Sequence, residues 1–525
     1  MSQGGTTLTR PLTRRAGRAA AALGIAAVAV AGAACAPAPP GAADTGPPPP
    51  GLERFYTQQL AWGACDGFAP TPDDAKRYAE ADLQCARLEV PLDYASPTGR
   101  TAQIAVLRHA TERRRIGSLV VNPGGPGGSG VQMAANLSGS FGDGPFDIVG
   151  FDPRGIGAST PKLDCLTPAE TAAERADLDL DPSPAGIATA EEETRAFVAK
   201  CVERSGGVDV LANAGTRDVA RDMDVLRAAL GDRKLTYLGY SYGTFIGSTY
   251  AEMFPGNVRA MILDGAVDPA EPTDVEAVAQ MAAFQNAFQV YAADCARATT
   301  CPLGTDPAAA TTAFQALARP LIATPAPAGP GHTLSYSDTV TAVIASLYSP
   351  SSWKDLTAGL TELKSGNGAR LLALADSYYA MDMDVLTIVR CVDDERLGDR
   401  GASAALSTQV LAAAPFADPG TPVVASLGVC DMWPAPPTSS RHVPNAEGLP
   451  TVLVVSTTGD PATPHAAGVA LAGALKARLL TVEGTQHGAV GTGWSCVDDI
   501  AADYLVDLSL PAEGTRCKVT KEVAS

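Results

Sequence analysis

The chain has 525 residues, of which 46% are hydrophobic and 18% are charged, and its formal net charge is −18. This composition excludes a disordered protein, and the length allows more than one compact unit. The strong negative charge argues against nucleic acid as a partner, because phosphate backbones would be repelled.

The first 34 residues are typical of an export signal, because four arginines precede the apolar run AAAALGIAAVAVAGAA. Its removal would take away those four positive charges and no acid, changing the net charge from −18 to −22. The pair Arg14-Arg15 also fits a twin-arginine signal. The stretch GAAC ending at Cys35 fits a degenerate lipobox, with Gly32 where a branched aliphatic residue is preferred. We therefore expect an export signal over residues 1–35, and lipid attachment at Cys35 and ordinary secretion both stay open.

The cysteines also indicate export. There are eleven, and ten remain when Cys35 is set aside, an even number that suits a disulfide framework in an oxidising compartment. No CxxC pair or Cys/His cluster has metal-ligand spacing, so we expect no metal site. Order along the chain suggests the pairs Cys65–Cys85, Cys165–Cys201, Cys295–Cys301, Cys391–Cys430 and Cys496–Cys517.

The remaining chain changes character several times. Residues 36–52 form a Pro-rich linker, and residues 53–268 alternate short β-branched runs with helical patterns. Residues 269–440 are Ala-rich and mostly helical, after which residues 441–525 return to strand, helix and strand. Apart from the export signal, no window is apolar over the roughly 18 residues that a membrane span needs. The pattern predicts an α/β fold with a mostly parallel central sheet, interrupted by a helical cap domain.

Within the stretch LTYLGYSYGTFIG, a single serine stands between two glycines directly after an apolar run. Gly239-Tyr240-Ser241-Tyr242-Gly243 matches G-x-S-x-G, the sharp turn from strand to helix that exposes a nucleophilic serine. The pentapeptide alone would be a weak signal, but the strand before it and the helical pattern after it favour a nucleophile.

A nucleophilic serine needs a base and an orienting acid, which follow it in the order acid, histidine on this kind of fold. His487 lies in a glycine-flanked loop after an apolar strand, whereas His465 begins a helix and is expected to be structural. Asp460 ends another strand, and Asp264, at the end of the strand after Ser241, is its rival. We favour Asp460, because its strand neighbours that of the histidine.

A glycine-rich stretch, VVNPGGPGGSG, allows two interpretations. It fits the dinucleotide fingerprint G-x-G-x-x-G, with Asp152 following at the end of a later strand. However, Pro126 removes an amide donor, and the next residues do not open a helix with an obvious apolar stripe. The alternative, which we favour, is an oxyanion loop in which the backbone N–H groups of Gly125 and Tyr242 face the substrate carbonyl oxygen. We expect Asp152 and Arg154 to form an internal ion pair rather than to act in catalysis.

Several stretches together resemble a known family, and they span nearly the whole mature chain: NPGGPGGSG, FDIVGFDPRGIGAS, YLGYSYGT, DCARATTCPLG, RCVDDE, VCDMWP, STTGDPATPHAAG and GTQHG. They are similar to secreted bacterial tripeptidyl aminopeptidase-like serine hydrolases, in the proline-iminopeptidase-related branch of the α/β-hydrolases. The resemblance implies a triad of Ser241, Asp460 and His487, and a cap that closes one end of a pocket for short peptides with a free α-amine. One departure is His465, which follows DPATP where an aromatic residue is expected and where it would alter the rim of the pocket.

An exopeptidase of this kind needs an anion to pair with the substrate ammonium. The cap stretch RCVDDERLGD offers Asp393, Asp394 and Glu395, although such an acidic run also fits a solvated face. Thr463, three residues after Asp460, is positioned either to support that carboxylate or to cap the following helix. The triad chemistry needs no metal or organic cofactor.

The sequence therefore predicts an exported, monomeric serine exopeptidase that removes short peptides, tripeptides in particular, from the N-termini of peptides or proteins. The expected location is outside the cytoplasm, secreted or associated with the cell envelope, with membrane attachment only through Cys35. Two alternatives stay open: a carboxylesterase or lipase with the same triad, and a non-catalytic envelope binding protein on a hydrolase scaffold.

Overall fold

The structure of the chain is a computed structural model that describes residues 46–141 and 144–519. The expected export signal, with Cys35, and residues 36–45 of the expected linker lie outside the described residues. All elements named below belong to one compact unit that begins at Ala43.

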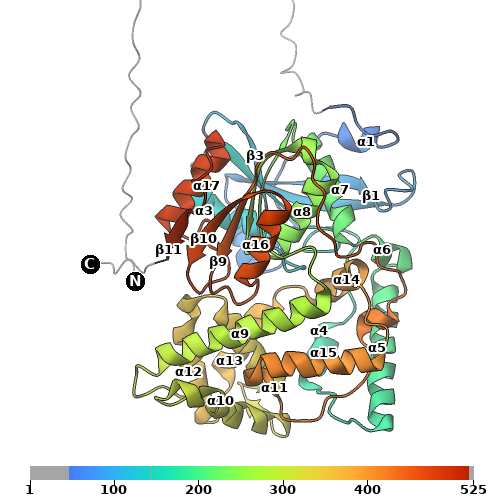
Figure 1. Ribbon diagram of the computed structural model, residues 1–525. Coiled ribbons are helices and arrows are strands. Elements are labelled where there is room, and N and C mark those ends of the chain that lie inside the picture. Colours follow the sequence, from blue (N-terminus) through green and yellow to red (C-terminus); the bar gives the residue numbers. More distant parts are fainter. Residues whose placement is uncertain (1–45, 142–143, 520–525) are drawn as a thin grey trace, which may run out of the picture. The chain divides into compact units, whose positions relative to one another are not determined.

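A central sheet of nine strands forms the upper half of Figure 1. Its strands follow the spatial order β1-β2-β4-β3-β5-β6-β9-β10-β11. β1 pairs antiparallel with β2, and β2 pairs antiparallel with β4, whereas all the other neighbours are parallel. In chain order the strands are β1 (Leu83–Pro91), β2 (Thr101–His109), β3 (Gly117–Asn122), β4 (Phe146–Phe151), β5 (Leu235–Tyr240), β6 (Val258–Asp264), β9 (Leu453–Thr457), β10 (Arg478–Glu483) and β11 (Arg516–Lys518).

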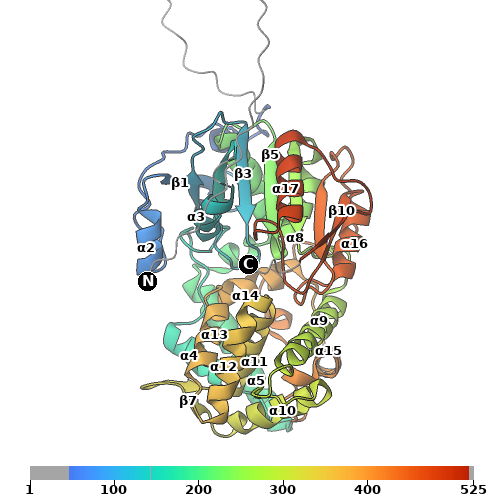
Figure 2. The same cartoon turned by 90° about the vertical axis from the view of Figure 1, so that its left-hand side faces the viewer.

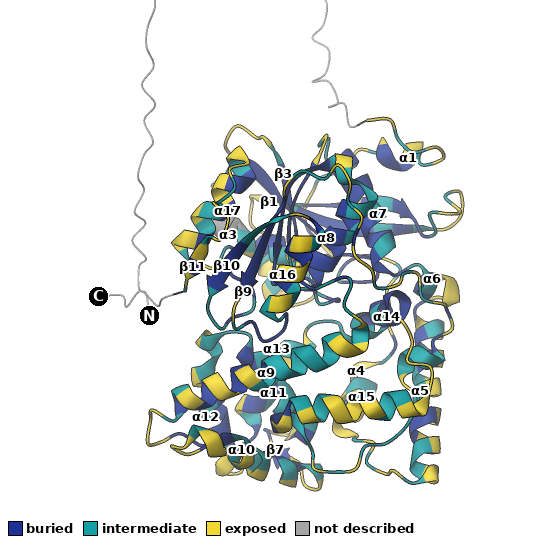
Figure 3. Cartoon of the chain, viewed as in Figure 1, coloured by how far each residue is buried: buried dark blue, intermediate teal, exposed yellow. Residues whose placement is uncertain are grey.

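The central strands are buried and largely apolar because helices cover both faces of the sheet. Every residue of β4 and of β9 is buried, and Figure 3 shows the same burial across the sheet. One face packs against α3 (Gly130–Phe141) and α17 (Ser495–Asp507). The other packs against α7 (Thr216–Ala229), α8 (Tyr242–Met253) and α16 (His465–Ala474). The predicted α/β fold with a mostly parallel sheet is confirmed.

A second, mostly helical layer occupies the lower half of Figure 2 and has its own core. In that core the ring of Phe288 stacks on Phe416 with 5.2 Å between their centroids. We call this layer the cap. Its helices are α4 (Pro168–Ala176), α5 (Pro184–Arg204), α9 (Thr273–Cys295), α10 (Ala310–Ala318), α11 (Tyr336–Leu347), α12 (Trp353–Lys364), α13 (Ala369–Tyr379), α14 (Met383–Asp393) and α15 (Arg400–Ala413).

Smaller elements complete the described residues: α1 (Glu53–Tyr56), α2 (Pro72–Tyr78), α6 (Val208–Ala212) and the short hairpin of β7 (Ala326–Pro327) with β8 (Thr333–Leu334). Across residues 46–141 and 144–519, no helix has both the length and the apolar character that a membrane crossing requires.

The cap is built from two stretches of sequence rather than one. The sequence places residues 53–268 in the core and residues 269–440 in the cap, but α4 and α5 lie beside the cap helices (Figure 1). Arg175 of α4 pairs with Asp338 of α11, and Arg400 of α15 pairs with Glu191 of α5. The cap thus receives helices inserted after β4 as well as helices inserted after β6.

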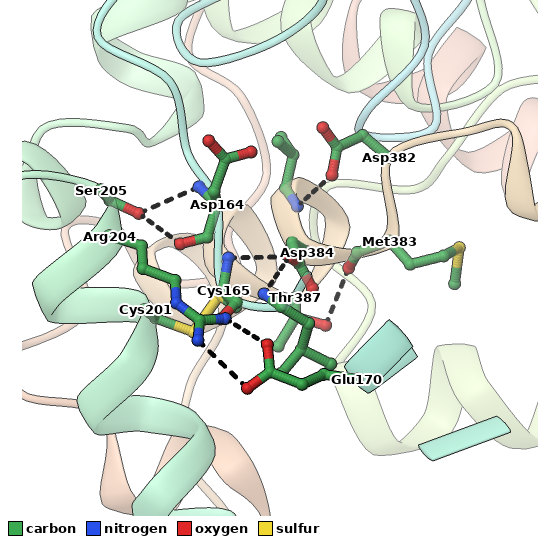
Figure 4. Close-up of a disulfide and its surroundings, with 12 residues drawn as sticks. Asp164, Cys165, Glu170, Cys201, Arg204, Ser205, Asp382, Met383, Asp384 and Thr387 are labelled. Atoms are coloured by element: carbon green, nitrogen blue, oxygen red, sulfur yellow. Dashed lines mark hydrogen bonds and ion pairs between the residues drawn. A yellow bond between two sulfur atoms is a disulfide. The ribbon is translucent and has the colours of Figure 1, made fainter. Parts of the chain in front are cut away.

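The described residues contain five disulfides, and they join the pairs that chain order suggests: Cys65–Cys85, Cys165–Cys201, Cys295–Cys301, Cys391–Cys430 and Cys496–Cys517. Figure 4 shows the surroundings of Cys165–Cys201. There, the carboxylate of Asp384, in the first turn of α14, accepts the backbone N–H groups of Cys165 and Leu166 at 2.7 and 2.9 Å. The disulfide therefore supports the segment that holds the start of α14.

Candidate active site

Ser241 occupies the turn between β5 and α8, the place where the G-x-S-x-G pattern predicts it. Its backbone has φ 54° and ψ −127°, a strained conformation for a residue with a side chain. Three hydrogen bonds hold the turn. The backbone N–H of Ser241 donates to the backbone oxygen of Asp264. The backbone oxygen of Ser241 accepts from the N–H and the hydroxyl of Thr244.

Both glycines of the pattern are needed because the chain approaches itself closely. A Cβ on Gly239 would lie 2.5 Å from the backbone oxygen of Gly243. A Cβ on Gly243 would lie 2.9 Å from the backbone oxygen of Asn122, at the end of β3. The turn can therefore fold against its neighbouring strand only without side chains at these positions.

His487 lies in the loop after β10, and its imidazole faces Asp460. The ring Nδ1 is 2.9 Å from each carboxylate oxygen of Asp460, and it is 3.3 Å from the hydroxyl of Thr463. This network assigns the Nδ1 proton to the bond with Asp460 and leaves Nε2 free to accept a proton. The backbone N–H of His487 donates to the oxygen of Tyr348, whose ring meets the imidazole edge-on.

Asp460 is fixed by its own hydrogen bonds. The side chain is fully buried, and Oδ1 accepts the backbone N–H groups of Ala462 and Thr463, each at 2.9 Å. The rival acid, Asp264, instead accepts the backbone N–H groups of Ala489 and Val490. Asp460 is thus the carboxylate that contacts the imidazole.

Two carboxylates act on the charge of the imidazole. Burial alone would lower the pKa of His487, but the charge and the hydrogen bond of Asp460, together with the charge of Asp264, raise that pKa above its ordinary value. The surroundings therefore favour the protonated imidazole, the state that forms when a histidine acts as a base.

The glycine-rich loop after β3 lies directly against the serine turn. A Cβ on Gly124, which has φ +87°, would lie 2.7 Å from the backbone nitrogen of Tyr242. The next residue, Gly125, lines the same cavity as Tyr242 and His487. A helix, α3, does follow the glycine-rich stretch, so that part of the expectation is wrong. The close approach of the loop to the serine turn agrees with an oxyanion loop.

The expected ion pair between Asp152 and Arg154 is wrong. The guanidinium of Arg154 pairs with Asp222 of α7, at 2.6 Å. Asp152 accepts the hydroxyl of Ser129, at 2.6 Å, and two backbone N–H groups. Ser129 and Val131 lie where the glycine-rich loop ends and α3 begins, so the carboxylate of Asp152 fixes that end of the loop.

A cavity of about 630 Å³ lies between the serine turn and the cap. The core contributes the glycine-rich loop, Tyr242, Thr463 and His487, while α9, α11, α13 and α14 form the cap side. Tyr348, Met383 and Leu386 give that side apolar surface, and Glu276 and Arg390 give it charge.

None of the three acids expected to bind an amine lines this cavity. Asp393 is buried and accepts the N–H of Thr216 and the hydroxyl of Tyr242. Burial raises the pKa of Asp393 to about 6, although these hydrogen bonds act against the rise. Asp394 is buried in ion pairs with two arginines, and Glu395 is exposed. Asp393 therefore holds Thr216 and the hydroxyl of Tyr242 in place and does not line the cavity.

Glu276, in the first turn of α9, is the acid that reaches the cavity. Its carboxylate is 3.3 Å from Arg390 and 2.7 Å from Arg441, and both arginines also pair with Asp394. Glu276 is not among the residues predicted from the sequence. No local signal distinguished it, because α9 also carries Asp274, Gln285 and Gln289, although Glu276 and Gln280, four residues apart, both line the cavity.

His465 is the residue that departs from the family pattern. It is not among the described residues that line the cavity. It begins α16, and its Nδ1 lies 2.8 Å from the hydroxyl of Ser456 on β9. The structural role expected for this histidine agrees with that contact, and the expected change to the pocket rim is absent.

Comparison with known proteins gives one family and several close relatives. Residues 117–493 match the family model described as the alpha/beta hydrolase fold. The chain is 46% identical to the serine protease Hip1 of Mycobacterium tuberculosis over 456 residues, covering 82% of this chain and 87% of that protein. It is 44% identical to carboxylesterase B of the same species over 492 residues, covering 91% and 92%.

A third relative is the tripeptidyl aminopeptidase of Streptomyces coelicolor, which is 32% identical over 468 residues and 83% of each chain. The relatives carry both protease and esterase names. The chain therefore belongs to the α/β-hydrolase fold family, as a serine hydrolase similar to the tripeptidyl aminopeptidases.

Proposed function

We propose that the protein is a serine exopeptidase that releases short peptides, tripeptides in particular, from free N-termini. Ser241 acts as the nucleophile, His487 as the general base and Asp460 as the acid that orients the base. The observation that carries the proposal is the contact of His487 with Asp460 beside a serine turn that opens into a capped cavity.

In this mechanism the hydroxyl oxygen of Ser241 attacks the scissile carbonyl carbon while its proton moves to Nε2 of His487. The bond from Nδ1 to Asp460 keeps the imidazole in the required tautomer and stabilises its protonated form. The protonated histidine then gives its proton to the leaving amine, and an acyl-enzyme remains. Water, activated by the same histidine, releases the acyl group.

The negative oxygen of the tetrahedral intermediate needs two donors. The backbone N–H of Tyr242 is the first of α8, where N–H groups have no acceptor within the helix. The N–H of Gly125 comes from the loop that packs against this turn. Both residues line the cavity, which supports their assignment as the oxyanion hole.

The free amine of the substrate would pair with Glu276. This assignment replaces Asp393, Asp394 and Glu395, since Glu276 is the cavity-lining acid of α9. Two acids and two arginines form a neutral group here, and the Glu276–Arg390 contact, at 3.3 Å, is the longest of its four ion pairs. An ammonium group could therefore compete for this carboxylate by a charge-assisted hydrogen bond.

The size of the cavity supports a short peptide. About 630 Å³ lies within the range of roughly 300–1,000 Å³ that is usual for small-ligand sites. Glu276 stands on the cap side and His487 on the core side, so a bound N-terminus would place a bond a few residues away next to Ser241.

We place the protein outside the cytoplasm. Five disulfides suit an oxidising compartment, and the N-terminal pattern of charge followed by an apolar run suits export. A monomeric state and the absence of a cofactor are parts of this proposal, and any membrane attachment would be through a lipid at Cys35.

A carboxylesterase is the second candidate, because carboxylesterase B is 44% identical over 91% of this chain. The same triad would serve an ester, whose leaving alcohol needs no recognition of an amine. The two candidates therefore differ in whether a free α-amine on the substrate matters.

The test compares three substrates: the chromogenic amide of a free tripeptide, its N-acetylated twin and a short-chain aryl ester. Each is assayed with the wild-type protein, Ser241→Ala, Glu276→Gln and the control Asp274→Asn. Asp274 lies in the same first turn of α9 as Glu276, but it is exposed and lies outside the cavity lining.

We expect Ser241→Ala to abolish all turnover. Glu276→Gln should raise KM for the free tripeptide about 10- to 100-fold, because a hydrogen bond to a charged group contributes about 1.5–3 kcal/mol. The acetylated substrate and Asp274→Asn should show no such change. Equal effects of Glu276→Gln on both amides would refute the amine anchor, and turnover of the ester alone would refute the peptidase.

A further inference from the structure

Asp264 is the last residue of β6 and lies at the centre of the site without touching the proposed substrate cavity. Its side chain is completely buried. Its backbone oxygen accepts the N–H of Ser241 at 3.0 Å, so the residue is already tied to the serine turn.

The carboxylate of Asp264 holds the loop that carries the histidine. Its Oδ2 accepts the backbone N–H of Ala489 at 2.7 Å and that of Val490 at 2.8 Å, two and three residues after His487. The hydroxyl of Tyr240, at the end of β5, donates to the oxygen of Val490 at 2.7 Å. The loop is therefore hydrogen-bonded to the end of β5, which leads into Ser241, and to the end of the neighbouring strand β6.

The imidazole of His487 rests on the residue next to Asp264. A Cβ on Gly265 would lie 3.0 Å from Cε1 of His487 and 3.3 Å from its Nδ1. No side chain at position 265 can therefore separate the ring from the end of β6. Asp460 occupies the Nδ1 side of the ring, and Asp264 is linked to His487 through the loop that its carboxylate holds and through Gly265.

Holding the loop does not by itself require a negative charge at Asp264. Its Oδ1 is buried, and no described residue donates a hydrogen bond to it. Within the described chain, no arginine, lysine or histidine forms an ion pair with this carboxylate. A neutral amide oxygen could accept the same two N–H groups, and burying a carboxylate without a counter-charge is costly.

The titratable groups that face Asp264 are His487, Asp460 and Tyr240. Burial raises the pKa of Asp264 to about 6, against the two N–H bonds and the charge of His487, which lower it. Of the three neighbours, only His487 becomes positive when it takes up a proton. The imidazole is thus the group on which a negative charge at Asp264 can act favourably.

We propose that Asp264 is a second carboxylate working on His487. It positions the loop of the histidine through the N–H groups of Ala489 and Val490, and its negative charge stabilises the imidazolium formed when His487 takes the proton of Ser241. The inference rests on the proposed role of His487 as the base. Asp264 is a positioning residue, since the proton moves only from the serine oxygen to Nε2 of the imidazole.

The test replaces the charge while keeping the shape, in Asp264→Asn. The control is Asp147→Asn, whose carboxylate is also buried and accepts a backbone N–H, from Thr111, but pairs with Arg115 and lies near the start of β4, away from the carboxyl ends of the parallel strands. The readout is the rate at which a fluorophosphonate probe labels Ser241 across a pH series. This rate needs an active serine and histidine, but it does not depend on whether the natural substrate is a peptide or an ester.

We expect Asp264→Asn to lower the plateau rate about tenfold, as expected when one charge is removed in a medium of low dielectric constant. The midpoint at which the rate rises should move to lower pH, because the imidazolium loses a stabilising charge. Asp147→Asn should leave the plateau and the midpoint unchanged. A purely structural role would lower the rate without moving the midpoint, and that result would refute the proposal.

The wild-type protein provides a second measurement that does not require the variant to fold. Protonation of Asp264 and of His487 should both slow labelling, so the acid limb should be steeper than one ionisation allows. A limb that fits a single ionisation would count against the role of Asp264. Failure of the wild type to be labelled at Ser241 would instead refute the catalytic assignment itself.

Discussion

Loss of the Cys165–Cys201 disulfide should weaken the protein more than loss of Cys295–Cys301, although both lie in the cap. The two cysteines are 36 residues apart in the first pair and 6 apart in the second. A disulfide restricts the unfolded chain, and the entropy of closing loops of these lengths predicts losses of about 4 and about 2 kcal/mol. The double Cys→Ser variants should therefore differ by about 2 kcal/mol in their free energy of unfolding.

Function should separate the two pairs more sharply. The segment at Cys165 supplies two N–H groups to Asp384 at the start of α14 (Figure 4). The same helix gives Met383, Leu386 and Arg390 to the cavity. We expect a higher KM in the Cys165→Ser, Cys201→Ser variant. The Cys295 pair closes a short loop at the far end of α9 from Glu276, so its removal should leave KM unchanged.

Urea unfolding followed by far-UV circular dichroism measures the first difference, and steady-state kinetics on the folded variants measures the second. Equal losses of stability in the two variants, or a greater loss in the Cys295 variant, would contradict the first prediction. A KM that is unchanged in the Cys165 variant would separate this disulfide from α14.

Three further predictions concern single residues. Gly265→Ala should reduce kcat at least about tenfold, because the new Cβ would lie 3.0 Å from His487 and Gly265 has a φ of +64°. The control Gly304→Ala, with open space around it, should keep full activity. Asp384→Ala should cost about 1–3 kcal/mol in urea unfolding, since two backbone donors lose their acceptor; an unchanged midpoint would contradict this. The base must be neutral to act, and the pKa of His487 is raised, so kcat/KM should fall as pH drops through a value above 6.5; a midpoint below 6.5 would show that the carboxylates do not dominate.

Short local patterns predicted the core of the site. The serine turn, the histidine loop and Asp460 each follow an apolar strand, and the carboxyl ends of parallel strands meet at one edge of the sheet. Their mutual approach therefore follows from sheet order. The glycines at positions 239 and 243 were also predictable from the local sequence, because their close contacts are with the turn itself and with the adjoining strand.

The cap could not be predicted in the same way. Helical periodicity indicates which face of α4 or α5 is buried, but not which layer buries it, and their partners Asp338 and Arg400 lie far along the chain. Glu276 was missed for a similar reason, because one acid in a helix acquires meaning only when other helices enclose it. Conversely, the acidic run from Asp393 suggested a ligand site, whereas the fold uses its first carboxylate as an acceptor for Thr216 and Tyr242.

The bond from the backbone N–H of His487 to the oxygen of Tyr348 makes the cap part of the proposed catalytic site. A second cap residue, Gln280, donates to the oxygen of Ala462, beside Asp460. A hinged lid that swings away would take these two supports with it and release both the base and its partner. Grafting a foreign cap onto this core, to change which acyl groups are accepted, would therefore have to reproduce a carbonyl and an amide donor at these two points before any new specificity could be expressed.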